Sequence, residues 1–371
     1  MSKKQSIALC GLFVLFILVC AVLNLCWPDR EFSPMENRTL AQRPDFSWKG
    51  LFSGEWTQDF ETYLTDQFPL RDTWVGLKYI CERAMLKQEN NGIYFAGDRL
   101  IARFDPPDET RVEQNFAAID ALAQNTGLPT RFMLVPTSAY IYQDELPANA
   151  PSYDQQQLLD RASQLQQAEN IPVAQALLDA REEYIYYRTD HHWTTKGAYL
   201  AYEAYMKAAG REDEILTQEE LEAVKQETPD FCGTLYSQAG ARFYEPDTIT
   251  WYDFPGLTME QPGKEPTSIY DRSYLDQKDK YSLFFGGNPP ALTIRNENPE
   301  AHGTLLVVKD SFANSLLPYL AESYEEIYVF DPRYNRTPIS EYAAQCGADE
   351  ILVLYQTGNF AEDVNVGLLS R

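Results

Sequence analysis

The sequence predicts an α/β protein in which a parallel β-sheet is covered by helices on both faces. Three observations support this fold class. Short apolar strands alternate with amphipathic helices in two parts of the chain, a pattern typical of parallel sheets. A stretch at 211–300 interrupts the alternation and separates the two parts. A long apolar run near the amino terminus precedes both and has the length of a membrane-spanning helix.

The apolar run extends from Ile7 to Trp27, and Lys3 and Lys4 precede it. About 20 apolar residues suffice to cross a bilayer at ~1.5 Å rise per residue. We therefore expect a cytoplasmic segment at 1–5, a transmembrane anchor at 6–27 and an extracytoplasmic remainder. A cleaved signal peptide is the alternative. An uncleaved anchor is favoured, because the run is long and lacks the small residues that signal peptidase prefers.

The segment after the anchor changes in composition twice. Residues 28–50 are rich in Pro, Arg, Glu and Ser, which predicts an extended tether. Residues 51–88 have apolar side chains at helical spacing, and one face of that pattern holds Trp74, Leu77, Cys81 and Met85. We expect one extracytoplasmic domain at 51–371.

The elements of the sheet follow in chain order. A turn at 90–92 leads into a strand that begins at residue 93. Further strands are expected as apolar runs at 131–136, 171–173, 184–187, 304–308, 326–330 and 350–355. Helices are expected at 110–125, 153–168, 196–209, 312–323 and 338–346. Thr194 or Thr195 would cap the helix at 196–209.

Residues 211–300 break this rhythm. An acidic helix is expected at 212–226, followed by a Gly-, Pro- and Tyr-rich stretch with strand-like pieces such as 248–252. We interpret the segment as an irregular α+β insertion between two halves of one α/β domain.

Composition excludes several classes of function. Lys and Arg number 31 against 55 Asp and Glu, a formal charge of −24. Nucleic-acid binding is not expected, because no basic field is available to neutralise phosphates. No Gly-rich phosphate loop or internal repeat occurs, and no cofactor is indicated. The six cysteines form no CxxC motif, so neither a disulfide framework nor a zinc site is implied.

Two of the three histidines are adjacent, in Thr-Asp-His-His-Trp-Thr at 189–194. Sites in open parallel sheets form at the carboxyl ends of strands. Asp190 and His192 follow the expected strand at 184–187. In an extended loop, residues two apart point the same way, so these two should share a side and His191 should point opposite.

Ser311 follows the expected strand at 304–308, where a helix begins. That position would expose its hydroxyl and place helix N–H groups nearby to stabilise an oxyanion. Serine needs a base, and His192 could accept its proton while Asp190 holds the imidazole. The three residues are therefore our expected Ser-His-Asp triad.

Each of these residues also has a structural interpretation. Ser311 or Asp310 could simply cap the following helix. His191 is expected to be structural, and Trp193 to pack in the core and wall the loop. His302 lies at the amino end of its strand, the wrong end for a site, and is expected to be structural.

A metal centre is another interpretation of the same loop. Asp190, His191 and His192 carry carboxylate and imidazole groups, which bind zinc or iron. No third histidine lies at a motif spacing, so we expect no metal.

The stretch at 187–194 resembles the signature of the DHHW family, which is similar to SGNH-hydrolase-like proteins of alginate and other polysaccharide O-acetylation. In those relatives an Asp-x-His-Trp motif supplies the acid and base, and a later Asp-Ser-Phe motif supplies the nucleophile. Asp190, His192 and Ser311 match these motifs. Shorter similar stretches at 36–38, 68–71, 90–94 and 135–136 extend the resemblance over most of the chain. The resemblance implies an SGNH-hydrolase-like sheet.

Lys309 and Gly233 occupy two notable positions within this resemblance. Lys309 stands where those relatives have Gly before Asp-Ser, and a Gly there would permit close backbone approach. Gly233 resembles a family position that could supply an oxyanion donor, with a turn glycine as the alternative. Asp310, His191 and Trp193 are further supporting residues.

The anchor and the resemblance together imply a membrane-anchored extracytoplasmic O-acyltransferase. It would move an acetyl group onto hydroxyls of a cell-surface polysaccharide through an acyl-Ser311 intermediate. A multipass membrane O-acyltransferase would be the partner that donates the acyl group. One alternative is a carbohydrate acetylesterase with the same triad, in which water attacks in place of a sugar hydroxyl. Another is a non-catalytic scaffold or glycan-binding subunit.

Overall fold

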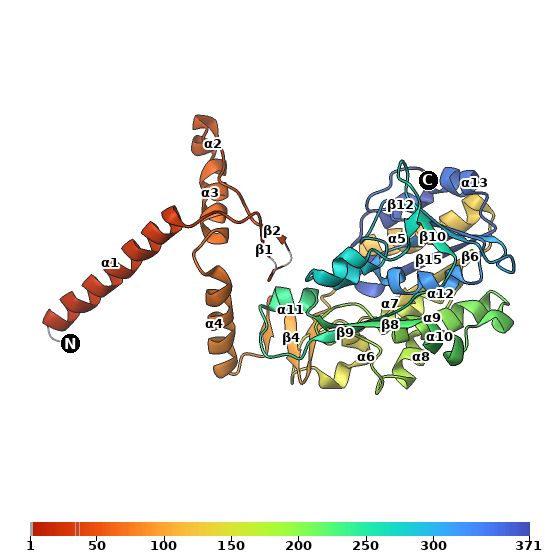
Figure 1. Cartoon of the computed structure of the whole chain (residues 1–371), viewed down its shortest axis with the longest axis horizontal. Coiled ribbons are helices and arrows are strands. Elements are labelled where there is room, and N and C mark those ends of the chain that lie inside the picture. The colour runs from red at the N-terminus through yellow and green to blue at the C-terminus, as the bar shows by residue number, and fades with distance from the viewer. Residues whose placement is uncertain (1–2, 34, 37) are drawn as a thin grey trace. The chain divides into compact units, whose positions relative to one another are not determined.

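The computed structural model describes residues 3–33, 35–36 and 38–371. Two compact units make up the chain (Figure 1). One holds the residues up to Lys87 together with 240–243, and the other holds 88–239 and 244–371. Part of the expected cytoplasmic segment at 1–5, and Asn37 in the family-like stretch at 36–38, lie outside the described residues. The expected domain boundaries stay predictions.

The amino-terminal unit is built from helices. Its helix α1 is long and apolar enough to cross a membrane, a criterion that a signal sequence also meets. The elements of this unit are α1 (Lys3–Cys26), β1 (Phe32–Ser33), β2 (Arg38–Thr39), α2 (Trp48–Ser53), α3 (Glu55–Asp66) and α4 (Arg71–Ala84).

The segment at 28–50, which we expected to be an extended tether, is bonded to the end of α3. Arg38 binds both carboxylate oxygens of buried Asp66, at 2.8 and 2.5 Å. The backbone N–H of Ala41 donates to the same carboxylate at 2.9 Å. The side chain of Gln67 donates to the carbonyls of Arg30 and Ala41. A fork of charge-assisted hydrogen bonds to a buried acid explains why a polar, Pro-containing segment is held in place here.

The second unit contains an eight-stranded sheet with the order β11-β10-β12-β14-β13-β15-β6-β7. The five strands from β14 to β7 run parallel, and the three at the other edge are antiparallel. The strand bounds, in sheet order, are Thr267–Ser268, Leu257–Glu260, Ala291–Asn296, Glu326–Phe330, Thr304–Lys309, Glu350–Gln356, Thr130–Val135 and Glu169–Asn170.

The central strands alternate between two cores, as period-2 side chains must. Met133, Leu305 and Leu352 face one core, which α6, α8, α9 and α12 cover. Phe132, Leu306 and Val353 face the other, which α5, α7, α13 and α14 cover. The expected α/β class, with a parallel sheet flanked by helices, is confirmed.

These helices have the following bounds. They are α5 (Glu109–Thr126), α6 (Ser138–Ile141), α7 (Gln156–Ala162), α8 (Ala174–Asp179), α9 (Thr195–Ala208), α12 (Leu317–Ala321), α13 (Ile339–Cys346) and α14 (Thr357–Glu362). Thr194 caps α9 by accepting from the N–H of Gly197, as the sequence predicted.

The segment at 211–300 joins the main sheet instead of standing beside it. It supplies the antiparallel edge strands β10, β11 and β12, and β12 pairs directly with β14. Its expected acidic helix is shorter than 212–226. Thr217 and Glu220 form a capping box that starts α10 (Gln218–Val224). The chain then enters β8 (Lys225–Phe231), which pairs with β9 (Asp247–Tyr252).

The remaining elements are small. A three-stranded antiparallel sheet contains β3 (Glu89–Asn90), β4 (Ile93–Ala96) and β5 (Arg99–Ala102). Helix α11 spans Thr234–Ala239. The 3₁₀ helices are η1 (Gln143–Glu145), η2 (Glu212–Glu214), η3 (Arg272–Asp276), η4 (Lys280–Leu283), η5 (Ser311–Ser315) and η6 (Val366–Ser370).

Several expected elements differ in the structure, among them the helix expected at 153–168, which is shorter, as α7 (Gln156–Ala162). Residues 184–187 form no sheet strand, because their backbone bonds to the returning loop: Thr194 N–H donates to Ile185 O at 2.9 Å. The strand expected at 171–173 lies slightly earlier, as β7 (Glu169–Asn170). The helix expected at 312–323 is divided into η5 and α12, with Pro318 in the first turn of α12. Proline without an N–H suits a helix start and not a helix interior.

Glu322, after α12, gives a testable prediction. Burial and the nearby charge of Glu220 raise its pKa from 4.5 to about 7. The folded protein therefore binds this proton more tightly than the unfolded chain, and stability falls as pH rises through that interval. We expect Glu322→Gln to raise the thermal unfolding midpoint above that of the wild type at ~pH 8 and to leave it unchanged at ~pH 4. Exposed Glu325→Gln is the control, and an equal response of the two variants would contradict the assignment.

Candidate active site

Ser311 begins a 3₁₀ turn directly after β13, and Asp310 caps that turn. One carboxylate oxygen of Asp310 accepts from the N–H of Phe312 at 2.8 Å. The other accepts from the N–H of Gln356 at 2.9 Å and from the side chain of Asn359 at 2.8 Å. Asp310 is fully buried. It is therefore a cap that also joins the Ser311 turn to the end of β15.

The histidine loop at 184–194 folds back on itself. An isolated antiparallel bridge joins Tyr186 to Trp193, and the N–H of Tyr187 donates to His192 O at 3.2 Å. Trp193 is fully buried, and its indole N–H donates to Phe312 O at 2.9 Å. Its ring packs on that of Phe312, with 5.4 Å between centroids. Trp193 is thus the expected core wall, and it also fixes the loop to the Ser311 turn.

The structure brings Asp190, His192 and Ser311 together. The distance from His192 Nε2 to Ser311 Oγ is 2.8 Å, and that from His192 Nδ1 to Asp190 Oδ1 is 2.6 Å. All three residues are buried. A carboxylate can only accept, so the second contact requires a proton on Nδ1. Nε2 is then free to accept the hydrogen bond of the serine hydroxyl.

Asp190 is held from three sides. Besides His192 Nδ1, the N–H groups of His192 and Thr234 donate to it at 2.9 and 2.7 Å. Burial raises the pKa of this carboxyl, but the two neighbouring imidazoles and these hydrogen bonds outweigh burial and hold it below its usual range. Asp190 therefore stays ionised beside the imidazole.

Gly233 lies against Asp190 because a side chain would not fit. A Cβ at this position would lie 2.3 Å from both the Cβ and Oδ2 of Asp190. The N–H of Gly233 donates to Thr189 Oγ1 at 3.0 Å, and that of Phe312 is bound to Asp310. Both backbone donors are therefore already engaged in this structure, so the Gly233 N–H is not available to an oxyanion here. Close packing explains the glycine better.

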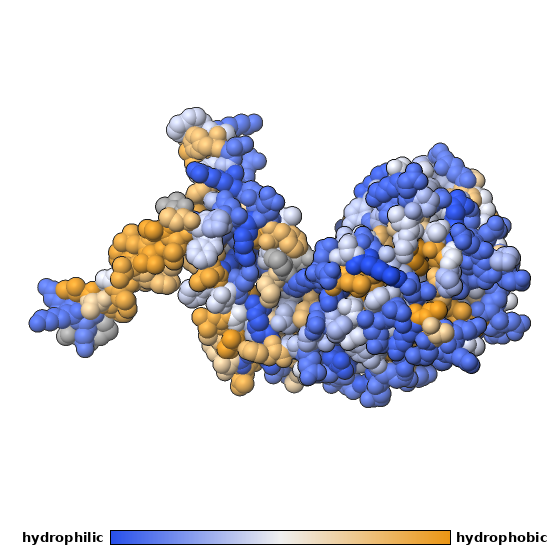
Figure 2. Space-filling view, in the orientation of Figure 1, coloured by the Kyte–Doolittle hydropathy of each residue, from blue (hydrophilic) through white to orange (hydrophobic). Residues whose placement is uncertain are grey.

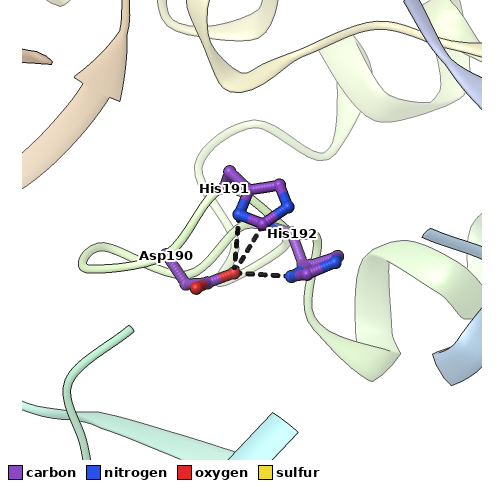
Figure 3. A group of neighbouring side chains, drawn as sticks. All are labelled: Asp190, His191 and His192. Carbon is purple, nitrogen blue, oxygen red and sulfur yellow. Dashed lines mark hydrogen bonds and ion pairs between the residues drawn. The ribbon is translucent and has the colours of Figure 1, made fainter. Parts of the chain in front are cut away.

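His191 lies beside His192 and does not point away from it, so the expectation of opposite sides is wrong. The two rings are 3.9 Å apart, and His191 Nδ1 lies 3.4 Å from Asp190 Oδ1. Figure 3 shows both imidazoles turned toward the carboxylate. The alternation rule fails because the loop bends at these residues and is not extended. Burial and the neighbouring imidazole of His192 lower the pKa of His191 to about 4, so this ring is neutral near neutral pH.

The ligand atoms of Asp190, His191 and His192 all lie within 4.8 Å of one another, a spacing that could hold a metal ion. The carboxylate, however, already accepts three hydrogen bonds at 2.9 Å or less. The imidazole of His192 is bound at both nitrogens. Asp190 and His192 are thus satisfied by the protein, and a metal would have to displace their bonds, whereas His191 Nδ1 is buried without a hydrogen-bond partner among the described residues.

Asp247 supports the loop and was not found from the sequence. It is buried at the start of β9 and accepts from the N–H groups of Arg188 and Thr189 at 2.9 and 2.8 Å. The hydroxyls of Thr189 and Tyr184 also donate to it. These bonds fix the backbone immediately before Asp190. A lone acid in the irregular 211–300 segment gives no motif signal, so only the three-dimensional structure identifies it.

Tyr281 is a second residue that the sequence did not single out. Its ring stacks on the imidazole of His192 at 3.9 Å, with an angle of 14° between the planes. Its hydroxyl donates to Ser311 O at 3.2 Å. One buried side chain therefore contacts both the expected base and the expected nucleophile. Its place in η4, in the 211–300 segment, shows that this segment helps build the site.

Lys309, where the resembling proteins have glycine, is fully buried. Its ammonium donates to Asn288 Oδ1 at 3.0 Å, and Asn314 donates to the same oxygen at 3.3 Å. Burial lowers the pKa of Lys309 to about 8. The side chain points to the 286–290 segment, so it does not occupy the space between Ser311 and His192. His302 lies at the amino end of β13, away from the site as expected.

A cavity of about 740 Å³ adjoins Asn288. Its lining is polar and aromatic and includes Tyr270, Arg272 and Tyr274. Ser311 and His192 are not among the lining residues, so this cavity does not form the immediate surroundings of the two side chains.

The arrangement can activate a serine. A neutral imidazole that accepts from the hydroxyl can take its proton as Oγ attacks a carbonyl, and a buried carboxylate stabilises the resulting imidazolium. Among the described residues, no other histidine contacts a serine hydroxyl in this way.

Comparison with known proteins points to the DHHW family in both sequence and structure. The family model described as DHHW protein matches residues 93–330, more than half of the chain. A DHHW family protein from Eubacterium siraeum has a TM-score of 0.64 at 24% identity and covers 76% of this chain and 95% of its own. PatB1 of Bacillus cereus has a TM-score of 0.62 at 22% identity, with 74% and 98% covered. At 24% and 22% identity, the likeness to these two structures establishes the fold of this chain and nothing beyond the fold.

One relative has a name that states an activity. The probable alginate O-acetylase AlgJ of Pseudomonas fluorescens is 22% identical over 216 residues. The match covers 54% of this chain and 51% of that protein, so the chain spans about half the length of this relative.

The close approach at Gly233 gives a prediction for the site. In Gly233→Ala the new methyl group must displace Asp190, and a shift on the order of 1 Å at a catalytic constellation costs about 10²-fold. We expect labelling of Ser311 by a fluorophosphonate to slow by about that factor. Gly367→Ala is the matched control, because no atom lies within 4 Å of a Cβ there. Equal labelling rates for the two variants would contradict the assigned contact.

Proposed function

Because the chain belongs to the DHHW family, we propose that it is a serine-dependent O-acyltransferase that acetylates hydroxyls of a cell-surface polysaccharide. One observation carries the proposal, the chain of hydrogen bonds from Ser311 Oγ through His192 to Asp190 at 2.8 and 2.6 Å. The similarity to the probable alginate O-acetylase AlgJ supports acetyl transfer to a polysaccharide.

The first half of the reaction acylates the enzyme. Ser311 Oγ attacks the acyl carbonyl carbon as His192 Nε2 takes the hydroxyl proton. The carbon–heteroatom bond of the donor breaks, and its leaving group takes the proton from His192. Asp190 stabilises the imidazolium between these two transfers. The N–H of Ser311 is the backbone donor that we assign to the oxyanion, since those of Gly233 and Phe312 are engaged.

The second half returns the enzyme to its starting state. A sugar hydroxyl gives its proton to His192 Nε2 and attacks the acyl carbon. The bond to Ser311 Oγ breaks, and the serine oxygen regains the proton from the imidazole. Water in place of the sugar would give acetate by the same steps, which is the esterase alternative.

We place the reaction outside the cytoplasm, with α1 as a single-pass anchor. Its apolar length and the lysines before it support this orientation. Acetyl donors made inside the cell would then have to cross the membrane, so we propose a multipass membrane O-acyltransferase as the partner that delivers the acyl group. The cavity beside Asn288, with its tyrosines and polar groups, is suited to a sugar chain.

The triad is tested by single substitutions. We expect Ser311→Ala to lower the rate of acetyl release from an aryl acetate by about 10⁴-fold or more, because no acyl-enzyme can form. Asp190→Asn should lower it by a factor on the order of 10⁴, because the imidazole loses its orienting charge. Normal circular dichroism would establish that the variants fold. Wild-type rates in folded Ser311→Ala would refute the mechanism and favour the non-catalytic scaffold.

Product analysis separates transfer from hydrolysis. With an aryl acetate donor and an oligosaccharide acceptor, acetylated sugar in the mass spectrum supports transfer, and acetate alone supports the esterase. The Ser311→Ala protein, which should yield neither product, is the control for spontaneous acetylation.

A further inference from the structure

Helix α4 presents an apolar face that the described residues of its own unit leave largely exposed. Leu70, just before the helix, and Trp74, Leu77 and Met85 are 57%, 43%, 47% and 73% exposed. Cys81, on the same side of the helix, is exposed as well. These five residues, which we call the α4 stripe, follow the 3.6-residue period. Figure 2 shows hydrophobic surface at the carboxyl end of this helix and along α1.

The opposite side of α4 is the side that packs. Gly76 and Tyr79 are buried, and a Cβ on Gly76 would lie 3.1 Å from the guanidinium of Arg242. That guanidinium donates to Asp72 O at 3.0 Å. Surface helices of globular units normally turn their apolar face inward. In α4 the inward face already packs within the unit, and the outward face is apolar as well. The α4 stripe therefore needs an apolar environment outside the core of its own unit.

Charge and position indicate which environment this is. The segment 71–87 holds four basic and two acidic residues, in a chain whose formal charge is −24. Lys78, one turn after Trp74, is largely exposed and borders the stripe. A basic amphipathic helix with Trp and Leu on one face is typical of segments that lie in a membrane interface.

The contact between α4 and α1 places this face at membrane depth. The ring of Trp74 packs edge-on against that of Phe16, with centroids 6.5 Å apart. Phe16 precedes the end of α1 at Cys26, a separation of about 15 Å at ~1.5 Å per residue. If α1 spans a bilayer with a hydrocarbon core of ~30 Å, Phe16 lies near its midplane, so the Trp74 ring beside it lies at the depth of the acyl chains. The Asn24 side chain also donates to Gln67 O at 3.4 Å, between α3 and α4.

We propose that the α4 stripe is a lipid-binding surface that contacts the acyl chains of the bilayer spanned by α1, with the neighbouring basic side chains directed toward the anionic headgroups. This inference rests on α1 being a membrane anchor, as proposed above, and goes beyond it by assigning a second membrane contact. The occupant is a phospholipid surface and not a second copy of the chain or a membrane protein.

The test is tryptophan quenching in full-length protein reconstituted into vesicles of phosphatidylcholine and phosphatidylglycerol that carry bromine on their acyl chains. Bromine quenches only rings within contact distance. We expect Trp74→Phe to lower the quenched fraction of the emission, because the variant loses a ring that contacts lipid. The matched control is Trp251→Phe, which removes a buried ring and should raise that fraction. An unchanged or higher fraction in Trp74→Phe would overturn the proposal.

Two further measurements distinguish a lipid surface from self-association of the chain and from failure of the α1 anchor. In nanodiscs with one chain each, made from the same brominated lipids, lipid contact predicts the same Trp74 quenching as in vesicles. Quenching that appears in nanodiscs but not in vesicles would mean that a second copy covers the stripe in vesicles, and would refute a lipid surface as its occupant. Carbonate extraction reports on the anchor separately: a chain that remains in the vesicles without Trp74 quenching refutes the α4 proposal alone. Ser311→Ala protein should show wild-type quenching, so a failure of the proposed chemistry leaves this result intact.

Discussion

The contact between Trp193 and Phe312 sets the relation between two segments that are 119 residues apart in the chain. The indole binds the Phe312 carbonyl and packs on its ring, which leaves the neighbouring residues His192 and Ser311 at hydrogen-bond distance. A buried Trp loses little conformational freedom and supplies a large contact area with one directional donor. Trp193 thus supplies packing energy and also fixes the position of the histidine loop relative to the Ser311 turn. The geometry of Asp190, His192 and Ser311 depends on it.

Three buried aspartates organise the loops around this contact. Asp190, Asp247 and Asp310 each accept at least three hydrogen bonds, and backbone N–H groups are among the donors in every case. A buried carboxylate without partners would be strongly destabilising, so each acid holds its loop in the one conformation that supplies its donors. Only Asp190 contacts the imidazole. The other two fix the backbone on either side of the chemistry, which is how a site on loops keeps its geometry.

The sequence predicted the framework better than the details of the site. The strands at 304–308, 326–330 and 350–355 were found because both faces of a central parallel strand are apolar. The structure also brings Asp190, His192 and Ser311 together, whereas their catalytic roles stay predictions. The orientation of His191 was not, because a rule for extended chain was applied to a bent loop. Asp247 and Tyr281 gave no signal, since their roles arise from tertiary contacts across the irregular 211–300 segment. The Gly233 contact with Asp190 likewise exists only once that segment has folded onto the loop.

The cap on the Ser311 turn has a consequence for the order of events during synthesis. Asp310 takes donors from Gln356 and Asn359, which lie 46 and 49 residues further along the chain. Domains begin to fold while the chain is still being made, amino-terminal parts first. The turn that holds the serine hydroxyl is nevertheless completed only by residues that emerge after it. A nascent chain can therefore form most of the sheet and still lack the complete cap on the Ser311 turn.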